Sequence, residues 1–224
     1  MTTPVGVLFD VDGTLVDSTY LHAVTWWQGF RAGGHDVPVA QIHRAVGMGA
    51  DRLLDHLLGS ERDRSQDELV RAVHAERYAP FLNQLRPLPG AANLLRACHE
   101  RGQRVALASS ATPEELTAMR RALAVDDAID AATSSGDAQR TKPEPDIIEA
   151  ALRKLGLETN HVVYVGDSIW DIAACAKLGV PCVALTCGGT SRAELAGAGA
   201  VAVYEDPADL LAHLDESPLT VVYA

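Results

Sequence analysis

Two pairs of aspartates lie where their carboxylates can act together. Asp10 and Asp12 follow an apolar run in the segment DVDGT, and Asp167 and Asp171 follow another in the segment GDSIWD. Residues i and i+2 of an extended chain point the same way, and residues one helical turn apart share a helix face. Converging carboxylates repel one another unless a cation lies among them, and carboxylates with water are ligands that Mg²⁺ prefers. The spacing therefore indicates a carboxylate site that can hold Mg²⁺.

Each pair also has an ordinary structural explanation. An Asp-rich segment containing Gly13 is typical of a surface turn, and Asp167 could cap the helix that follows it. The position of Asp10 favours chemistry, because a strand buried on both faces ends at the crevice where open α/β sheets bind ligands.

Two further segments carry groups that could hold an anion. Ser109 and Ser110 end an apolar run just before a helix expected to begin at Pro113, where hydroxyls and free amides can bind an anion or simply cap the helix. Lys142 precedes Pro143, which favours an extended backbone at the entrance of the next helix. A solvated loop lysine is the alternative interpretation.

The elements that must position these residues alternate between strand and helix. The expected strands, which are apolar runs without alternation, are residues 5–9, 105–108, 162–165, 182–185 and 200–203. The expected helices between them are residues 91–100, 113–122, 145–155 and 169–177. This order predicts an α/β fold, a Rossmann-like doubly wound parallel sheet.

A helical insert interrupts this alternation after the first strand. Residues 21–32, 50–58 and 67–85 carry apolar side chains at helical spacing, and the segment RPLPG at 86–90 is a natural return linker. We expect a catalytic core of residues 1–16 and 88–224 and a helical cap of residues 17–87. The cap would lie above the carboxyl ends of the strands, with hinges near 15–17 and 85–89.

With these segments in this order, the chain resembles the haloacid dehalogenase superfamily of aspartate-nucleophile phosphohydrolases. The resemblance covers nearly the whole chain: DVDGT, Ser109, Lys142 and GDSIWD match the four motifs, and the insert matches the helical cap of subfamily I. The branch it resembles contains phosphoglycolate phosphatases and β-phosphoglucomutases.

The resemblance implies a role for each matching residue. Asp10 would be the nucleophile that forms an aspartyl phosphate, and Asp12 the general acid and base, with a pKa above that of Asp10. Asp10 and Asp167 by their side chains and Asp12 by its carbonyl would bind Mg²⁺, with Asp171 in support. Ser109, Ser110 and Lys142 would hold the phosphoryl oxygens, and Lys142 would offset their charge.

The activity expected from this resemblance is Mg²⁺-dependent hydrolysis of small phosphate monoesters, such as a sugar phosphate or a phosphoglycolate-like compound. Asp12 argues against dehalogenation, since halide leaves without a proton. The chain has no lysine before Lys142, which removes the cap lysine of phosphonate hydrolysis and weakens the case for a mutase. A phosphosugar mutase is still the first alternative, and a non-catalytic binding protein on the same fold is the second.

Residues of the expected cap bear on the substrate. His22 follows Asp17 by five residues, a pattern shared by sugar phosphatases and mutases of this branch, and could contact substrate or pack against Trp26 one turn further on. Arg44 and Arg52 could hold a second phosphate in place of a lysine. The loop VGMGA at 46–50 lies where the caps of the family contact substrate, although its glycines also suit a helix joint.

Composition limits the partners. Nineteen lysines and arginines against 30 acids give the 224-residue chain a formal charge of −11, which argues against nucleic acid and anionic membranes. The N-terminal apolar run is too short for a signal peptide or a membrane span, and the four cysteines lack CxxC spacing. We expect a cytoplasmic protein with reduced thiols, a monomer or weak homodimer, acting on a small phosphorylated metabolite.

Overall fold

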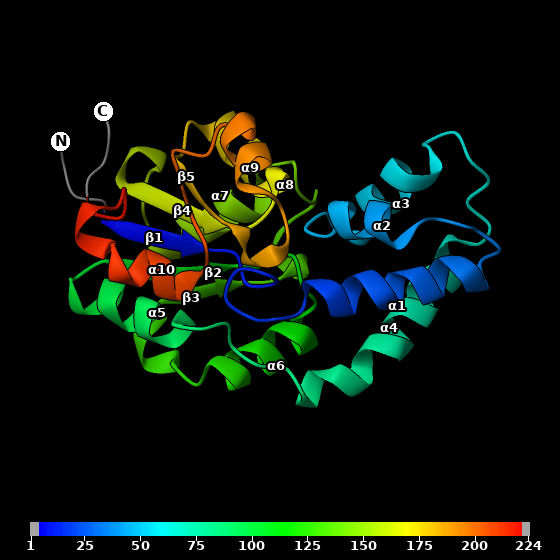
Figure 1. The fold of residues 1–224 in the computed structure, drawn as a ribbon, viewed down its shortest axis with the longest axis horizontal. Helices are drawn as coiled ribbons and strands as arrows, with labels where there is room; N and C mark the ends of the chain where they lie inside the picture. Colours follow the sequence, from blue (N-terminus) through cyan, green and yellow to red (C-terminus); the bar gives the residue numbers. More distant parts are fainter. Residues whose placement is uncertain (1–4, 221–224) are drawn as a thin grey trace.

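Six parallel strands form one sheet, in the order β3-β2-β1-β4-β5-β6, within residues 5–220, the part of the chain that the computed structural model describes (Figure 1). The strands are β1 (Gly6–Phe9), β2 (Arg104–Ala108), β3 (Ala131–Thr133), β4 (Val162–Gly166), β5 (Cys182–Leu185) and β6 (Ala202–Tyr204). β1 pairs with β2 on one side and with β4 on the other, with Phe9 opposite Leu107 and Val165. The sheet therefore changes its winding direction at β1, where doubly wound sheets bind their ligands.

The central strands β1, β4 and β5 are buried on both faces, which explains their unbroken apolar runs. Val7 and Phe9 point to the face covered by α5 (Ala91–Glu100), α6 (Pro113–Leu123) and α10 (Pro207–Ala212). Leu8 points to the opposite face, covered by α7 (Asp146–Leu155), α8 (Ile169–Leu178) and α9 (Arg192–Ala198). Because neighbouring residues of a strand face opposite sides, four residues of β1 serve both layers.

The helices between β1 and α5 pack around a separate apolar core. They are α1 (Thr19–Ala32), α2 (Val39–Ala45), α3 (Ala50–Leu58) and α4 (Asp67–Tyr78), and a short 3-10 helix at Ala79–Asn83 follows them. The shared core includes Trp26, Phe30, Ile42, Leu54 and Val70. Figure 1 shows these four helices to the right of the sheet, beyond its strands, with α1 lying against α4.

The two chain segments that join these helices to the sheet run side by side. The amide of Asp17 donates to the carbonyl of Arg86 at 3.0 Å, and the amide of Leu88 donates to the carbonyl of Leu15 at 2.8 Å. Val16 and Pro87 form an antiparallel bridge between these bonds. The exit and return segments of the helical insert are thus held together by backbone hydrogen bonds.

The observed elements confirm the predicted fold class and correct some details. Strands β1, β2, β4, β5 and β6 and the expected helices all occur, and their bounds lie within a few residues of the prediction except for the helix expected over 67–85. The pattern did not identify β3, α2 or α10. The expected helix over 67–85 ends at Tyr78 and continues as the 3-10 helix, whose second residue is Pro80.

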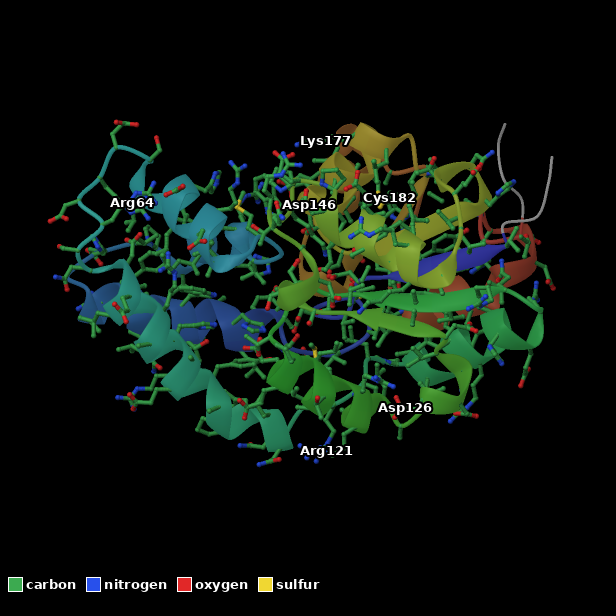
Figure 2. All side chains as sticks on the ribbon, turned by 180° about the vertical axis from the view of Figure 1, so that it is seen from behind. Arg64, Arg121, Asp126, Asp146, Lys177 and Cys182 are labelled. Carbon is green, nitrogen blue, oxygen red and sulfur yellow. The ribbon has the colours of Figure 1, made fainter. Side chains whose placement is uncertain are left out.

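Two further observations concern the cysteines and the helices. The four cysteines are free, and three of them are buried, including Cys182 on β5, which is labelled within the core in Figure 2. Between residues 5 and 220, no helix combines the length and the apolar character needed to span a bilayer.

Candidate active site

The loop after β1 places Asp10 and Asp12 at the carboxyl end of the central strand. Asp10 follows Phe9 directly and is buried. The loop then turns back on itself, with the amides of Leu15 and Val16 both donating to the carbonyl of Val11. Gly13 has a φ of +76°, and a Cβ there would overlap the Thr19 hydroxyl and come within 2.6 Å of an Asp167 oxygen. The turn therefore needs glycine on both conformational and steric grounds.

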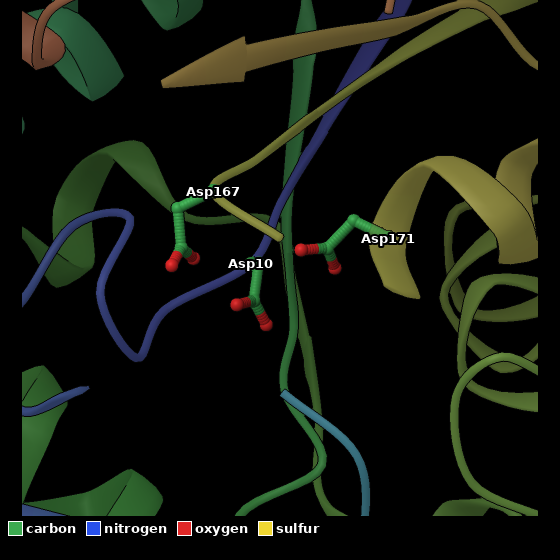
Figure 3. Close-up of side chains that lie close together, drawn as sticks. All are labelled: Asp10, Asp167 and Asp171. Atoms are coloured by element: carbon green, nitrogen blue, oxygen red, sulfur yellow. The ribbon is translucent and has the colours of Figure 1, made fainter. Parts of the chain in front are cut away.

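Three buried carboxylates meet at this point, as Figure 3 shows. Asp10, Asp167 and Asp171 each offer an oxygen, and these oxygens lie within 4.8 Å of one another. Asp167 follows β4 and accepts a hydrogen bond from the Thr14 hydroxyl at 2.7 Å. Asp171 lies in the first turn of α8. The structure thus brings together the two acidic segments that the sequence places 157 residues apart.

The N-terminal capping residue of α8 distinguishes the two interpretations of Asp167, as a helix cap or as a member of the carboxylate site. Ser168, and not Asp167, is the N-cap residue: its hydroxyl accepts from the amide of Asp171, whose carboxylate accepts in return from the amide and hydroxyl of Ser168. The carboxylate of Asp167 is therefore not used as a helix cap, and faces Asp10.

Lys142 lies between two of these acids. Its Nζ is 2.6 Å from an oxygen of Asp10 and 2.7 Å from an oxygen of Asp171, and its side chain is 1% exposed. Burial lowers the pKa of Lys142, but Asp10 and Asp171 raise it further, so the net shift is upward and the amine is charged. The other two lysines are about 40% exposed, and Figure 2 shows Lys177 on the outer surface of the core.

One cation does not balance three acids. Burial, together with the charges of Asp171 and Asp12, outweighs Lys142 and raises the pKa of Asp10 to about 7. Burial and the charges of Asp10 and Asp171 raise the pKa of Asp167 well above its ordinary value. Such a cluster favours a bound cation, because each carboxylate is more easily ionised when positive charge lies beside it.

The donor set fits a small hard cation such as Mg²⁺. Asp171 already accepts from Lys142, Ser168 and Tyr164. Asp10 and Asp167 each keep one carboxylate oxygen without a protein donor among the described residues. Thr19 lines a small cavity together with Asp167. Its hydroxyl is buried and has no hydrogen-bond partner among residues 5–220. This arrangement leaves Asp10 and Asp167 as the available side-chain ligands and Asp171 in a supporting position.

Asp12 has a different environment from Asp10. The hydroxyl of Ser18 donates to Asp12 at 2.6 Å, and Nε2 of His22 lies 3.2 Å from the same oxygen. Burial raises the pKa of Asp12, but His22 and Ser18 lower it by more; burial lowers the pKa of His22, but Asp12 raises it by more.

These contacts reverse the expected order of the two pKa values. Asp12 was expected to have the higher pKa, yet its pKa is lowered while that of Asp10 is raised. The cause is the neighbours: Asp10 lies among two further carboxylates, whereas Asp12 faces an imidazole and a hydroxyl. A cation beside Asp10 would lower its pKa and narrow this difference.

His22 and Trp26, for which packing against each other was one of two possibilities, both stack on rings of α4. The His22 ring stacks on Tyr78 and the Trp26 ring on His74, each with ring centroids 4.0 Å apart. His74 accepts or donates a hydrogen bond with the Thr25 hydroxyl at 2.9 Å, and burial lowers its pKa to about 3. Both His22 and His74 also line the cavity beside the acidic cluster.

A cavity of about 480 Å³ opens between the acidic cluster and helices α1, α3 and α4. Asp10, Asp12, Lys142 and Ser110 line it on the sheet side. Ser109 is fully buried beneath the loop, where its hydroxyl accepts from the amide of Ala111 at 3.0 Å. Of the two serines, only Ser110 therefore lies on the cavity wall.

Arg44 and Arg52, which we expected could hold a second phosphate, do not line the cavity. Arg44 pairs with Glu194 and Arg52 lies 3.5 Å from Glu144, so both contact the core outside the cavity. Arg71 and His74 of α4 line the cavity instead. Sequence reasoning missed both, because a charged residue on an amphipathic helix gives no sign of which structure it faces.

The loop at 46–50 also lines the cavity, as the resemblance implied. Gly47 has a φ of +101°, and a Cβ on Gly49 would overlap the side chain of Thr141, next to Lys142. Glycine at 49 thus lets the loop lie directly against the segment that carries Lys142.

Comparison with known proteins identifies similar hydrolases both by sequence and by structure. The family model described as haloacid dehalogenase-like hydrolase matches residues 5–179. A phosphoglycolate phosphatase of Rhodospirillum rubrum is 32% identical over 218 residues, which are 92% of this chain and 89% of that protein.

Solved structures agree with this similarity. A hydrolase from Pseudomonas syringae has a TM-score of 0.89 at 34% identity, covering 96% of this chain and 99% of that one. CbbY from Rhodobacter sphaeroides, solved in complex with phosphate, has a TM-score of 0.75 at 23% identity over 95% of this chain and 99% of that one. At that identity the likeness to CbbY shows the fold alone.

Proposed function

We propose a function for this chain, which belongs to the haloacid dehalogenase-like hydrolase family. The proposed function is the hydrolysis of small organic phosphate monoesters through an aspartyl phosphate. The observation that carries this proposal is the buried carboxylate of Asp10. It lies at the tip of the central strand, faces the cavity, is bonded to Lys142, and has Asp167 beside it.

The proposed reaction has two steps on Asp10. In the first, an Asp10 oxygen bonds to phosphorus while the bond from phosphorus to the ester oxygen breaks, and Asp12 gives a proton to the departing alcohol. In the second, Asp12 takes a proton from water, the water oxygen bonds to phosphorus, and phosphate leaves Asp10. The contact between Asp12 and His22 lets the pair hold one proton, which supports this role although the pKa of Asp12 is lowered.

The remaining groups would hold the phosphoryl oxygens. Lys142 carries the positive charge. The hydroxyl of Ser110 and the backbone amides of the loop after β2 provide hydrogen-bond donors on the same wall of the cavity. Ser109 supports the loop through its bond to Ala111. These positioned donors and the charge of Lys142 favour transfer, since phosphoryl transfer depends mostly on positioning and charge stabilisation.

We infer that the acidic cluster holds Mg²⁺. Asp10 and Asp167 would bind it by their side chains and Asp12 by its carbonyl, while Asp171 positions Lys142. Bound there, the cation would offset the repulsion between the phosphate dianion and Asp10. Residues 17–87 would form a cap over this site, with 1–16 and 88–224 as the core, and the paired segments near Val16 and Pro87 as hinges.

Other expectations stay predictions. These are the cytoplasmic location, a monomer or weak homodimer, and the absence of nucleic acid and membrane partners. The phosphosugar mutase hypothesis gains no specific support, because His22, which phosphatases and mutases of this branch share, contacts Asp12 in a way that suits both reactions.

Phosphate release from a panel of small phosphate monoesters tests the proposed function. We expect release with Mg²⁺ and its loss after chelation, restored when Mg²⁺ is added back. No release from any ester of the panel with Mg²⁺ present would contradict the proposal. Interconversion of glucose 1-phosphate and glucose 6-phosphate without net phosphate release would favour the mutase.

A further inference from the structure

Arg71 lies on the cavity wall away from the carboxylate cluster and has unused hydrogen-bonding capacity. It is on α4, three residues before His74, and both side chains line the cavity. Its Nε is buried and has no acceptor among residues 5–220. A buried N–H without a partner is costly, so this atom would gain from an acceptor supplied by a ligand.

Among the described residues that line the cavity, Arg71 is the cation that the proposed reaction does not use. Lys142 is held between Asp10 and Asp171. His22 is paired with Asp12, and burial keeps His74 neutral with a pKa of about 3. A negative group on the leaving-group side of a substrate would therefore find its positive partner in Arg71.

The present partner of Arg71 is easily replaced. Arg71 donates through Nη2 to Asp51, whose side chain is 77% exposed, and the same nitrogen is 3.8 Å from Asp67. Exposed ion pairs contribute little because water and salt screen them. Asp67 is already engaged by Arg62 at 2.7 Å.

The planar guanidinium is suited to an oxyanion. Nε and one Nη form a fork that can donate two parallel hydrogen bonds to a carboxylate or a phosphate. The walls of the same cavity include Trp26, Leu53 and Ala75, which suit the carbon skeleton of a small metabolite.

We propose that Arg71 binds a second oxyanion on the leaving group of the substrate, in exchange for its pairing with Asp51. This inference rests on the proposed phosphatase function and narrows its substrate class to small phosphate esters that carry a further carboxylate or phosphate. Arg71 is then a specificity-determining residue of the cap side.

Matched two-carbon esters test the proposal. With Mg²⁺ present, kcat/KM is measured for 2-phosphoglycolate, which has a carboxylate, and for ethylene glycol monophosphate, which has a hydroxyl in its place. The ratio of the two values is the readout. A parallel arm replaces the carboxylate by a second phosphate, using ethylene glycol bisphosphate, and tells which oxyanion Arg71 prefers.

Arg71→Gln should lower the ratio at least about tenfold in the preferred arm, because it removes the charged fork. Arg77→Gln is the matched control: Arg77 is on the same helix, is exposed, and does not line the cavity, so the ratio should stay at the wild-type value. A ratio unchanged by Arg71→Gln in both arms would overturn the proposal.

Asp51→Asn separates recognition from structure. If Asp51 competes with the substrate oxyanion, its neutralisation should keep or raise the ratio, opposite in direction to Arg71→Gln. A fall as large as that of Arg71→Gln would mean that the ion pair only supports the fold, and would contradict the proposal. Wild-type protein that cleaves both kinds of ester equally well overturns this inference alone, whereas no cleavage of any ester overturns the proposed function.

Discussion

Lys142 shows how strongly the charges of this site depend on one another. It is buried between Asp10 and Asp171, and in the proposed reaction its ammonium group would offset the repulsion between the Asp10 carboxylate and a dianionic phosphate. The same burial that makes the pair costly to assemble strengthens its interactions with a bound phosphoryl group. We therefore expect the buried position of Lys142 to serve the binding of a ligand, and not the stability of the fold alone.

Chemistry-bearing residues were predictable to the extent that their segments carry a pattern. Asp10, Asp12, Asp167 and Lys142 each follow or precede a recognisable element, and the structure brings them to one place. Arg71 and His74 had no such signal, because only the packing of α4 against α1 decides what that face of the helix meets.

His74 gives a prediction at the residue scale. Its folded pKa of about 3 lies below the unfolded value of 6.5, so between these values the unfolded chain binds a proton that the folded chain does not. Its contribution to stability is therefore complete above pH 6.5 and is lost as the pH falls toward 3. Between pH 6 and 4 the free energy of unfolding of wild type should fall more steeply than that of His74→Gln, by up to about 1.4 kcal/mol per pH unit.

Urea unfolding at several pH values measures this difference. Thr25 offers a hydrogen bond to either side chain, so glutamine is a fair substitute for the neutral imidazole. Equal slopes for the two proteins over that pH interval would mean that His74 is not kept neutral by burial.

The carboxyl ends of the strands position most of the candidate site residues of the core. β1 and β4 deliver Asp10 and Asp167, and the loop after β2 delivers Ser109 and Ser110, to the same edge of the sheet. The apolar runs made these strands predictable. β3 was not, since Ala131–Thr133 is three residues long and contains two alanines, and its place at the sheet edge comes from pairing with β2.

The joint between the loop at 46–50 and Thr141 gives a prediction at this scale. Gly49→Ala places a methyl group on the Thr141 side chain and should push the loop away from the segment that carries Lys142. The backbone φ of −72° accepts alanine, so any loss comes from the contact itself. We expect kcat/KM to fall roughly 10- to 100-fold, because small displacements at such a joint misplace the reacting groups.

Steady-state kinetics of single and double variants check this interpretation. Thr141→Gly relieves the overlap and should restore part of the lost activity in the Gly49→Ala background. A Gly49→Ala enzyme with wild-type kcat/KM would show that the contact does not matter for the reaction.

At the scale of the whole molecule, the helical insert and the core meet over a site that neither completes alone. The core supplies Asp10 and Lys142, and the insert supplies His22, His74 and Arg71. The alternation of strands and helices was enough to predict the doubly wound parallel sheet, and the family comparison confirms that fold class. Which side chains of the insert face the core depends on long-range packing, which the chain's local pattern does not encode.

Cation binding gives a prediction for the stability of the folded protein. Mg²⁺ that binds the folded acidic cluster should raise the free energy of unfolding by about 2.7 kcal/mol at 100 times its Kd, or the melting temperature by roughly 5–10 °C. Asp167→Asn should abolish most of this rise without lowering the melting temperature in chelator, since it removes a buried acid whose ionisation is already disfavoured.

Thermal melts with Mg²⁺ and with chelator measure the effect. Asp127→Asn, an exposed acid far from the cluster in sequence, is the control and should keep the full rise. A rise of the same size in Asp167→Asn would place the bound cation elsewhere.

Phosphate release by Asp10→Asn tests directly whether Asp10 is the nucleophile. Asparagine keeps the size of the side chain and removes the nucleophilic carboxylate. We predict that kcat on the best ester of the panel falls on the order of 10³-fold or more, while the folded protein, monitored by circular dichroism, is retained. Phosphate release within tenfold of wild type would contradict the proposed reaction, because Asp10 would then not be the group that receives the phosphoryl group.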